Sequence, residues 1–231
     1  MLLTQPIWAQ PTAEVTIRFV HRAGGKKIVL HDSAYSNAFG EAYQLTRLKY
    51  YISNARLAGA LQPVKKSVHL IDAAGEDSFS IWVKPGTAQQ LEFKMGVDSL
   101  YNCSGAQDGE LDPLKGMFWS WNSGYIFFKL EGYSSSSTAD LQRIEHHVGG
   151  YLGSHDASRI IRLTLPQPLK LKAGEKHLIE VTLDLDKYWN SSNKISLKED
   201  PVCTLPGPLA MKIAQNFKHM FSLTGVKLNE K

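Results

Sequence analysis

The sequence predicts a single all-β domain, an antiparallel β-sandwich with a short C-terminal helix. Apolar and polar residues alternate with a period of two in segments along the whole chain, as they do in strands that bury one face. Turn-forming residues separate these segments. No helical segments alternate with them, as they would in an α/β protein. These three observations favour two packed sheets.

Alternating apolar residues define the predicted strands in order from the N-terminus. They are Val15, Ile17 and Phe19; Leu48, Tyr50 and Ile52; Phe79, Ile81 and Val83; Leu91, Phe93 and Met95; Ile126, Phe128 and Leu130; and Ile179, Val181, Leu183 and Leu185. Turns are expected at Gly24-Gly25, Pro85-Gly86, residues 173–175 and residues 191–193. Residues 134–137 are all serine and should form a flexible tip, so residues 125–133 and 141–148 are expected to form a long hairpin.

Residues 208–223 depart from the strand pattern. Leu209, Ile213 and Phe217 recur every four residues, which is the spacing of one helix face. Pro208 suits the first turn of a helix. We therefore expect a helix near the C-terminus.

The size and composition of the chain agree with one sizeable domain. Its 231 residues suit a large β-sandwich, and 43% hydrophobic with 21% charged residues are enough for a core. The net charge of +4 is spread along the chain, whereas nucleic-acid binders concentrate basic residues, so we expect no nucleic-acid partner. No segment is long and apolar enough for a transmembrane segment.

Residues 1–10 are interpreted as a signal-peptide remnant, which leaves residues 11–231 as the mature domain. Trp8-Ala9-Gln10 has the small-residue character of a signal-peptidase site, and Leu2-Leu3 could end an apolar region. A disordered tail is the alternative. Export would place Cys103 and Cys203 in an oxidising compartment, where a disulfide is one hypothesis and free or metal-bound thiols are the others. No CxxC spacing exists, which excludes a zinc ribbon.

Motifs that would indicate an enzyme are absent from the sequence. There is no G-x-S-x-G nucleophile elbow, no P-loop and no G-x-G-x-x-G. We therefore expect a non-enzymatic, ligand-binding protein.

Histidines on predicted strands are the first candidate ligands. His21 and His31 bracket a predicted hairpin, and His69 lies in a short apolar strand. His146 and His147 lie in the far arm of the serine-tipped hairpin, and adjacent strand residues face opposite sides, so only one of them can face a given site. Two or three strand imidazoles would suit copper or zinc. Surface or hydrogen-bonded histidines are the alternative.

A loop rich in oxygen ligands is the second candidate. Asp98, Asn102, Asp108 and Asp112 lie close together in the sequence, and calcium prefers such ligands. The spacing is not that of an EF-hand. Turn and helix-capping roles are the alternative.

Trp119 and Trp121 form the third candidate. At positions i and i+2 of a strand they would face the same way. They indicate either a buried aromatic cluster or a ligand platform that includes an oxidisable, metal-proximal tryptophan.

Several motifs together resemble the MbnP-like family of bacterial proteins. They are LKYYISN at 48–54, GELDP at 109–113, GMFWSWNSGY at 116–125, LEG at 130–132, HVGG at 147–150, and IAQNF with MF at 213–217 and 220–221. The resemblance covers residues 15–225. It implies an exported β-rich protein linked to copper handling.

The resemblance also implies a ligand set. Some family members bind copper through histidines and kynurenine, an oxidised tryptophan made by a partner di-haem enzyme. The matching positions are His147 and one of Trp119 or Trp121, with His21 and His69 as further candidates.

The leading hypothesis is therefore a periplasmic or cell-surface attached copper-binding protein without enzymatic activity. The alternative is a β-sandwich binding or structural module that holds no transition metal, with or without calcium in the acidic loop.

Overall fold

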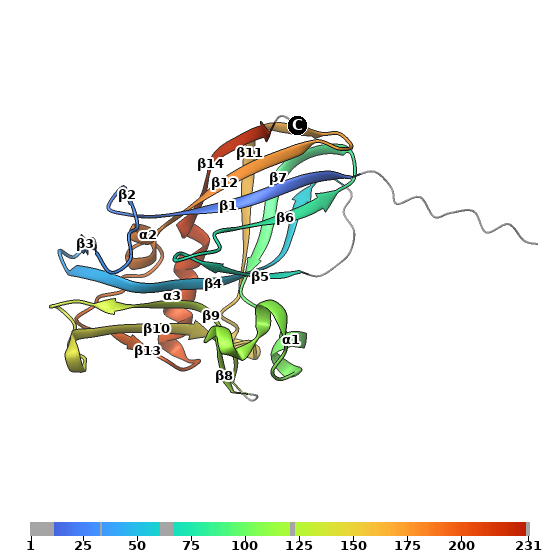
Figure 1. Ribbon diagram of the computed structural model, residues 1–231. Coiled ribbons are helices and arrows are strands. Elements are labelled where there is room, and N and C mark those ends of the chain that lie inside the picture. The colour runs from blue at the N-terminus through green and yellow to red at the C-terminus, as the bar shows by residue number, and fades with distance from the viewer. Residues whose placement is uncertain (1–11, 33, 61–66, 121–122, 230–231) are drawn as a thin grey trace, which may run out of the picture.

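The computed structural model describes residues 12–32, 34–60, 67–120 and 123–229 (Figure 1). The strands are β1 (Ala13–Ala23), β2 (Lys26–Lys27), β3 (Ala34–Ser36), β4 (Ala42–Ala58), β5 (Val68–Asp72), β6 (Ser78–Val83), β7 (Gly86–Met95), β8 (Phe118–Ser120), β9 (Gly124–Tyr133), β10 (Arg143–Gly149), β11 (Arg159–Leu171), β12 (Lys176–Asp184), β13 (Val202–Cys203) and β14 (Phe221–Asn229). The helices are α1 (Ser99–Cys103), α2 (Leu185–Trp189) and α3 (Pro208–Met220), with short 3₁₀ helices η1 (Gly109–Leu111), η2 (Pro113–Lys115), η3 (Asp140–Gln142) and η4 (Gly153–His155).

Two sheets pack against each other, which confirms the predicted β-sandwich. One has the order β14-β12-β1-β2, with β6 also on β1. The other has the order β11-β7-β4-β9-β10-β13, with β3 and β5 on β4 and β8 on β9. Figure 1 shows β1, β12 and β14 above β4, β9 and β10. Most pairs are antiparallel as predicted, but β1 with β12 and β10 with β13 run parallel, so each sheet is mixed.

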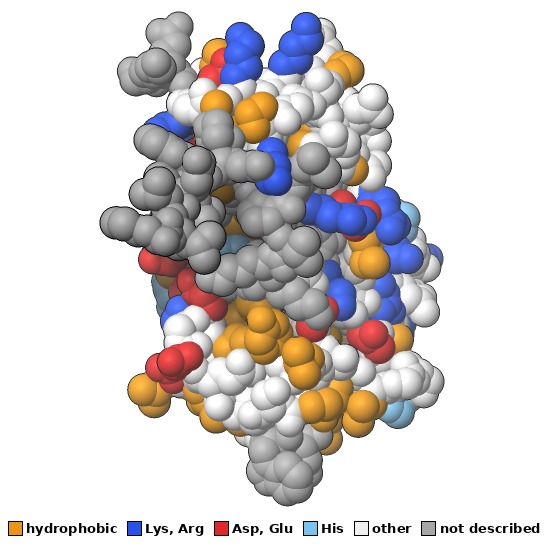
Figure 2. Space-filling model, turned by 90° about the vertical axis from the view of Figure 1, so that its right-hand side faces the viewer, with side chains coloured by type: hydrophobic (Ala, Val, Ile, Leu, Met, Phe, Trp, Pro, Cys, Tyr) orange, Lys and Arg blue, Asp and Glu red, His pale blue; other side chains and the backbone are white. Residues whose placement is uncertain are grey.

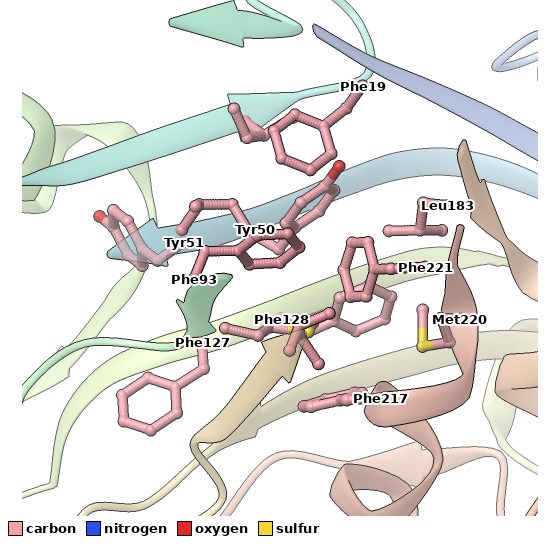
Figure 3. Packing of buried hydrophobic residues seen from close by; sticks show 14 of the residues in the cluster. Phe19, Tyr50, Tyr51, Phe93, Phe127, Phe128, Leu183, Phe217, Met220 and Phe221 are labelled. Carbon is pink, nitrogen blue, oxygen red and sulfur yellow. The ribbon is translucent and has the colours of Figure 1, made fainter. Parts of the chain in front are cut away.

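The core between the sheets is aromatic at its centre. Phe19 of β1 meets Tyr50 of β4 and Phe93 of β7, with ring centroids 5.8 and 5.9 Å apart. Phe221 lies 5.3 Å from Phe93, so all four rings converge from both sheets (Figure 3). The alternation that predicted the strands therefore marks the residues that fill the core.

The predicted C-terminal helix is present as α3, but it ends three residues earlier than expected. Phe221 has extended backbone angles and begins β14. β14 pairs along β12, with Phe221 opposite Leu183. Tertiary pairing therefore converts the last apolar residues of the helical pattern into a strand.

The predicted hairpin is β9 and β10, which fixes the direction of its two histidines. His146 lies opposite Leu130 and is fully buried, whereas His147 lies opposite Lys129 and is half-buried on the outer face of the sheet. The expectation that only one of them faces a given site is thus confirmed.

Cys103 and Cys203 are both free thiols, so the disulfide hypothesis is wrong for this structure. Cys103 is exposed on α1, whereas Cys203 is buried on β13 beside His146. An oxidising compartment favours pairing only between sulfurs that the fold brings together. Residues 1–10, interpreted as a signal remnant, lie outside the described residues. In the part of the chain that is described, no helix is long and apolar enough to cross a membrane.

Candidate functional site

His147 lies in a group of charged side chains on the outer face of β9 and β10. Its Nε2 is 2.7 Å from Glu131 Oε1, and its Nδ1 is 3.9 Å from Glu145 Oε1. Because a carboxylate only accepts hydrogen bonds, Nε2 is the donor to Glu131. The hydrogen bond from His147 is the main cause that holds the pKa of Glu131 below its ordinary value. Nδ1 is therefore the nitrogen of His147 that a metal could reach.

Basic side chains surround this carboxylate. Arg47 lies 2.8 Å from Glu131, and the Lys129 ammonium lies 3.7 Å from it. Lys129 also donates to the Gly116 carbonyl at 2.5 Å, and burial lowers its pKa. Two nearby cations oppose a bound metal cation at His147.

Trp119 lies close to the strand that carries His147. A Cβ built at Gly149 would be 2.8 Å from the Trp119 ring and 2.6 Å from the Tyr125 carbonyl oxygen, so the indole packs directly on Gly149. Gly149 follows His147 by two residues, or about 7 Å along a strand. Trp121 lies outside the described residues.

His21 is buried between the sheets and its imidazole is hydrogen-bonded. Its Nε2 lies 3.0 Å from the Tyr50 hydroxyl. Burial lowers the pKa of His21 to about 4, although Asp77 opposes the shift. A polar hollow of about 410 Å³ borders this histidine, with Lys27 and Glu180 also in its lining. His21 therefore has a structural partner already.

His69 has a different environment. Its ring stacks flat on Phe79 of the other sheet, with centroids 3.9 Å apart and planes 1° from parallel. Its Nε2 atom is buried and has no hydrogen-bond partner among the described residues. Burial lowers the pKa of His69 below its ordinary value, so the imidazole is neutral at pH 7. A neutral imidazole with an unpartnered nitrogen is chemically suited to a soft or borderline metal ion.

The predicted ligands do not form one cluster. His21 contacts Tyr50 and His69 stacks on Phe79, so the two histidines contact different rings of the core, whereas His147 is on the outer face. Among the described residues, no group of three or more His, Cys, Asp or Glu side chains could hold a metal ion. The site residues expected from the sequence are therefore separate candidates in this structure.

The acidic loop uses its polar side chains to hold itself together. Asp98 accepts from Asn54 at 2.8 Å and from Lys94. Buried Asn102 donates to the Val97 and Asp98 carbonyls and accepts from the Tyr125 amide at 2.9 Å. Asp112 caps η2, and Asp108 is exposed. Asp112 thus has the capping role that was one alternative to calcium, whereas the side chains of Asp98 and Asp108 cap no helix.

Two sets of partners were missing from the sequence analysis. Glu131 and Glu145 share the outer face with His147, and hairpin register with strand alternation could have identified them. His146 binds the Tyr188 hydroxyl through Nδ1 and the Asp200 carbonyl through Nε2, both at 2.6 Å. No local signal places Tyr188 there, since it is 42 residues away in the chain.

The end of the molecule that carries α1 has an apolar surface. Figure 2 shows hydrophobic side chains gathered on the lower part of this face, while lysines and arginines lie above and to one side. Leu100 of α1 and Leu114 of η2 are among the exposed large apolar residues.

Comparisons with known proteins agree on one family. The MbnP family model matches residues 12–205. The fold is similar to the solved structure of MbnP from Methylosinus trichosporium, with 16% sequence identity, a TM-score of 0.58 and coverage of 87% of each chain. A search among curated proteins found no match.

Proposed function

This chain belongs to the MbnP family, and from that premise we propose that it is an exported, non-enzymatic copper-binding protein. The family is associated with copper handling. In this proposal the protein acts in the periplasm or attached to the cell surface. The absence of nucleophile and nucleotide motifs supports a binding role.

The single observation that carries the copper assignment is the buried Nε2 of His69, which has no hydrogen-bond partner within the described parts of the chain. Leaving a buried polar atom without a hydrogen bond costs stability, by about 1–3 kcal/mol. A bound metal ion would use the lone pair of this atom and remove that cost. His147 is the second candidate ligand through Nδ1, although its carboxylate partners and the nearby Arg47 and Lys129 favour an ion-pair role.

One imidazole does not make a tight copper site, so the proposal needs further ligands. Oxidation of a tryptophan to kynurenine would supply an aryl amine and a ketone with available lone pairs, unlike the indole N–H, which only donates. A partner di-haem oxidase is the proposed source of that modification. Trp119 is the described candidate, and Trp121 is the other.

Copper affinity of natively produced protein tests the proposal. Competition with a copper(I) chelator should show that His69→Ala weakens binding by at least about tenfold, or about 1.4 kcal/mol. His155→Ala, in an exposed position on η4, is the matched control and should bind like the parent. If His147→Ala alone weakens binding, the site is on the outer face instead.

Equal affinity in all three variants would reject both histidines. That result would favour the second candidate function, a β-sandwich binding module without a transition metal. This second function is supported by one observation: among the described residues, no three His, Cys, Asp or Glu side chains form a group that could hold a metal ion. Export is tested separately, by N-terminal sequencing of protein recovered from the periplasmic fraction. Recovery from the cytoplasm with Met1 retained would contradict it.

A further inference from the structure

Two fully buried tyrosines each form a hydrogen bond to a buried histidine. Tyr188 pairs with His146 at 2.6 Å, and Tyr50 pairs with His21 at 3.0 Å. All four side chains are 5% exposed or less. Copper binding through His69 does not involve these two pairs, so the proposed function does not explain them.

The direction of the proton in the shorter pair follows from its other partner. His146 Nε2 lies 2.6 Å from the Asp200 carbonyl oxygen, which only accepts, so Nε2 carries the hydrogen. The ring is fully buried, and burial favours the neutral imidazole because a buried charge is costly, so Nδ1 has no hydrogen. The Tyr188 hydroxyl therefore donates to Nδ1. Burial also raises the pKa of Tyr188 well above its ordinary value, so the phenol keeps its proton in the resting protein.

Tyr188 also lies at the inner end of a series of oxidisable rings. Its ring centroid is 4.8 Å from that of Trp189, which is 5.2 Å from Tyr43, which is 5.7 Å from Tyr35. Exposure rises along the series, from 0% at Trp189 to 2% at Tyr43 and 7% at Tyr35. The series therefore connects the Tyr188–His146 pair with the surface near β3.

We propose that Tyr188 and His146 form a proton-coupled redox site, which Trp189, Tyr43 and Tyr35 connect electronically to one-electron oxidants at the surface. An external one-electron oxidant, such as a high-potential metal complex, takes one electron from Trp189 through Tyr43 and Tyr35. The Trp189 radical cation then takes one electron from Tyr188. The phenolic proton moves to Nδ1 of His146, which leaves a neutral phenoxyl radical and an imidazolium. A one-electron reductant of the ascorbate class later returns the electron, and the proton returns to the phenolate oxygen.

The geometry explains why Tyr188 is the end of the series. Oxidation of a phenol makes its proton strongly acidic, so the reaction is easiest where a base already accepts that proton. Tyr43 has no such base, because its hydroxyl is buried without a hydrogen-bond partner among the described residues. Tyr50 has one in His21, but the rings that contact it are those of Phe19, Phe128, Phe221 and His21, and none of these is a tryptophan. Only Tyr188, among these tyrosines, has both an adjacent tryptophan and a proton acceptor.

Flash photolysis with ruthenium tris-bipyridine and a sacrificial electron acceptor, followed by rapid freezing and electron paramagnetic resonance, tests the proposal. The full chain is used with Trp82→Phe and Tyr133→Phe, because these side chains are 55% and 51% exposed and would be oxidised directly. We expect a tyrosyl radical that forms more slowly in D₂O than in H₂O. Tyr188→Phe should abolish it, and Tyr50→Phe should leave it in place as the matched control.

Trp189→Phe should slow formation of the radical without changing its spectrum. Near-ultraviolet circular dichroism checks that each variant retains its packing. The isotope measurement uses the unsubstituted Tyr188–His146 pair, so equal rates in D₂O and H₂O would reject the proposal even where a core variant fails to fold. A radical that persists in folded Tyr188→Phe protein, the absence of any tyrosyl radical, or equal rates in D₂O and H₂O would each overturn the proposal.

Discussion

The imidazole of His69 lies flat on the ring of Phe79, with centroids 3.9 Å apart and planes 1° from parallel. The stack joins β5 of one sheet to β6 of the other. It shields the histidine from water while leaving Nε2 without a hydrogen-bond partner among the described residues. His21 and His147 differ in this respect, because each has a ring nitrogen engaged by a neighbouring side chain. This contrast leads to the first prediction.

Replacing His69 with phenylalanine should stabilise the metal-free protein. The substitution removes a buried polar atom that has no partner and keeps an aromatic ring against Phe79. We expect a gain of about 1 kcal/mol in the free energy of unfolding, or a melting temperature about 2–4 °C higher. His21→Phe should have the opposite effect, because it leaves the buried Tyr50 hydroxyl unpaired. Thermal melts in the presence of a chelator measure both. A loss of stability in His69→Phe would mean that its nitrogen has an unrecognised structural role.

Gly149→Ala should displace Trp119 and destabilise the fold. The added Cβ would lie 2.6 Å from the Tyr125 carbonyl oxygen and 2.8 Å from the indole ring. Overpacking of this kind costs about 1–3 kcal/mol. Denaturant unfolding gives the stability, and near-ultraviolet circular dichroism reports the indole. Gly75→Ala is the control, because a Cβ there has no described atom within 4 Å. Unchanged stability and spectrum in Gly149→Ala would show that the two segments separate easily.

The strands were predictable where burial alone decides the pattern. Phe19 and Tyr50 alternate with polar neighbours and fill the core. Among the strands that were not predicted, β11 and β14 are the longest, and each has its own reason. Pro166 lies in the middle of β11, and a proline argues against a strand because it cannot donate a backbone hydrogen bond. The strand tolerates it because the pairing of β11 with β7 is irregular between Thr164 and Leu169. The first residues of β14 continue the apolar pattern of α3, so the sequence predicts helix there. They form a strand because they pair with β12 at the edge of its sheet.

The candidate site was less predictable than the fold. Local sequence patterns predict strands, but they do not show which distant segments pair or in what register. Alternation correctly separated His146 from His147. Alternation could not show that His146 forms hydrogen bonds with the Tyr188 hydroxyl and the Asp200 carbonyl. These partners are 42 and 54 residues away from His146 in the sequence. The parallel pairing of β1 with β12 was not predicted for the same reason, because the two strands are far apart in the sequence. The motifs identified the family, while convergence of ligands remained a hypothesis.

Calcium should not stabilise the protein through the acidic loop. Asn102 is buried and uses its amide for three backbone contacts, and Asp112 caps η2. We therefore expect the same melting temperature with excess calcium and with a chelator, since a ligand stabilises only the state it binds. Asn102→Ala should lower stability by about 1–3 kcal/mol, because it leaves backbone groups unpaired. A calcium-dependent rise in melting temperature that disappears in Asp108→Asn would restore the calcium alternative.

Stability should fall as the pH drops from 7 to 5, because His21 and His146 are buried in their neutral forms. Burial lowers the pKa of each to about 4, against 6.5 for an unperturbed histidine. Below pH 6.5 the unfolded chain binds protons that the folded chain does not, so acid favours unfolding until the pH passes the folded value near 4. One pKa unit corresponds to about 1.4 kcal/mol, so each histidine should remove about 2 kcal/mol between pH 6.5 and 5. Urea unfolding at pH 7, 6 and 5 measures this slope. His21→Phe should show a shallower slope than the parent while its stability at pH 7 is lower. Parallel slopes in the two proteins would show that His21 does not titrate with folding.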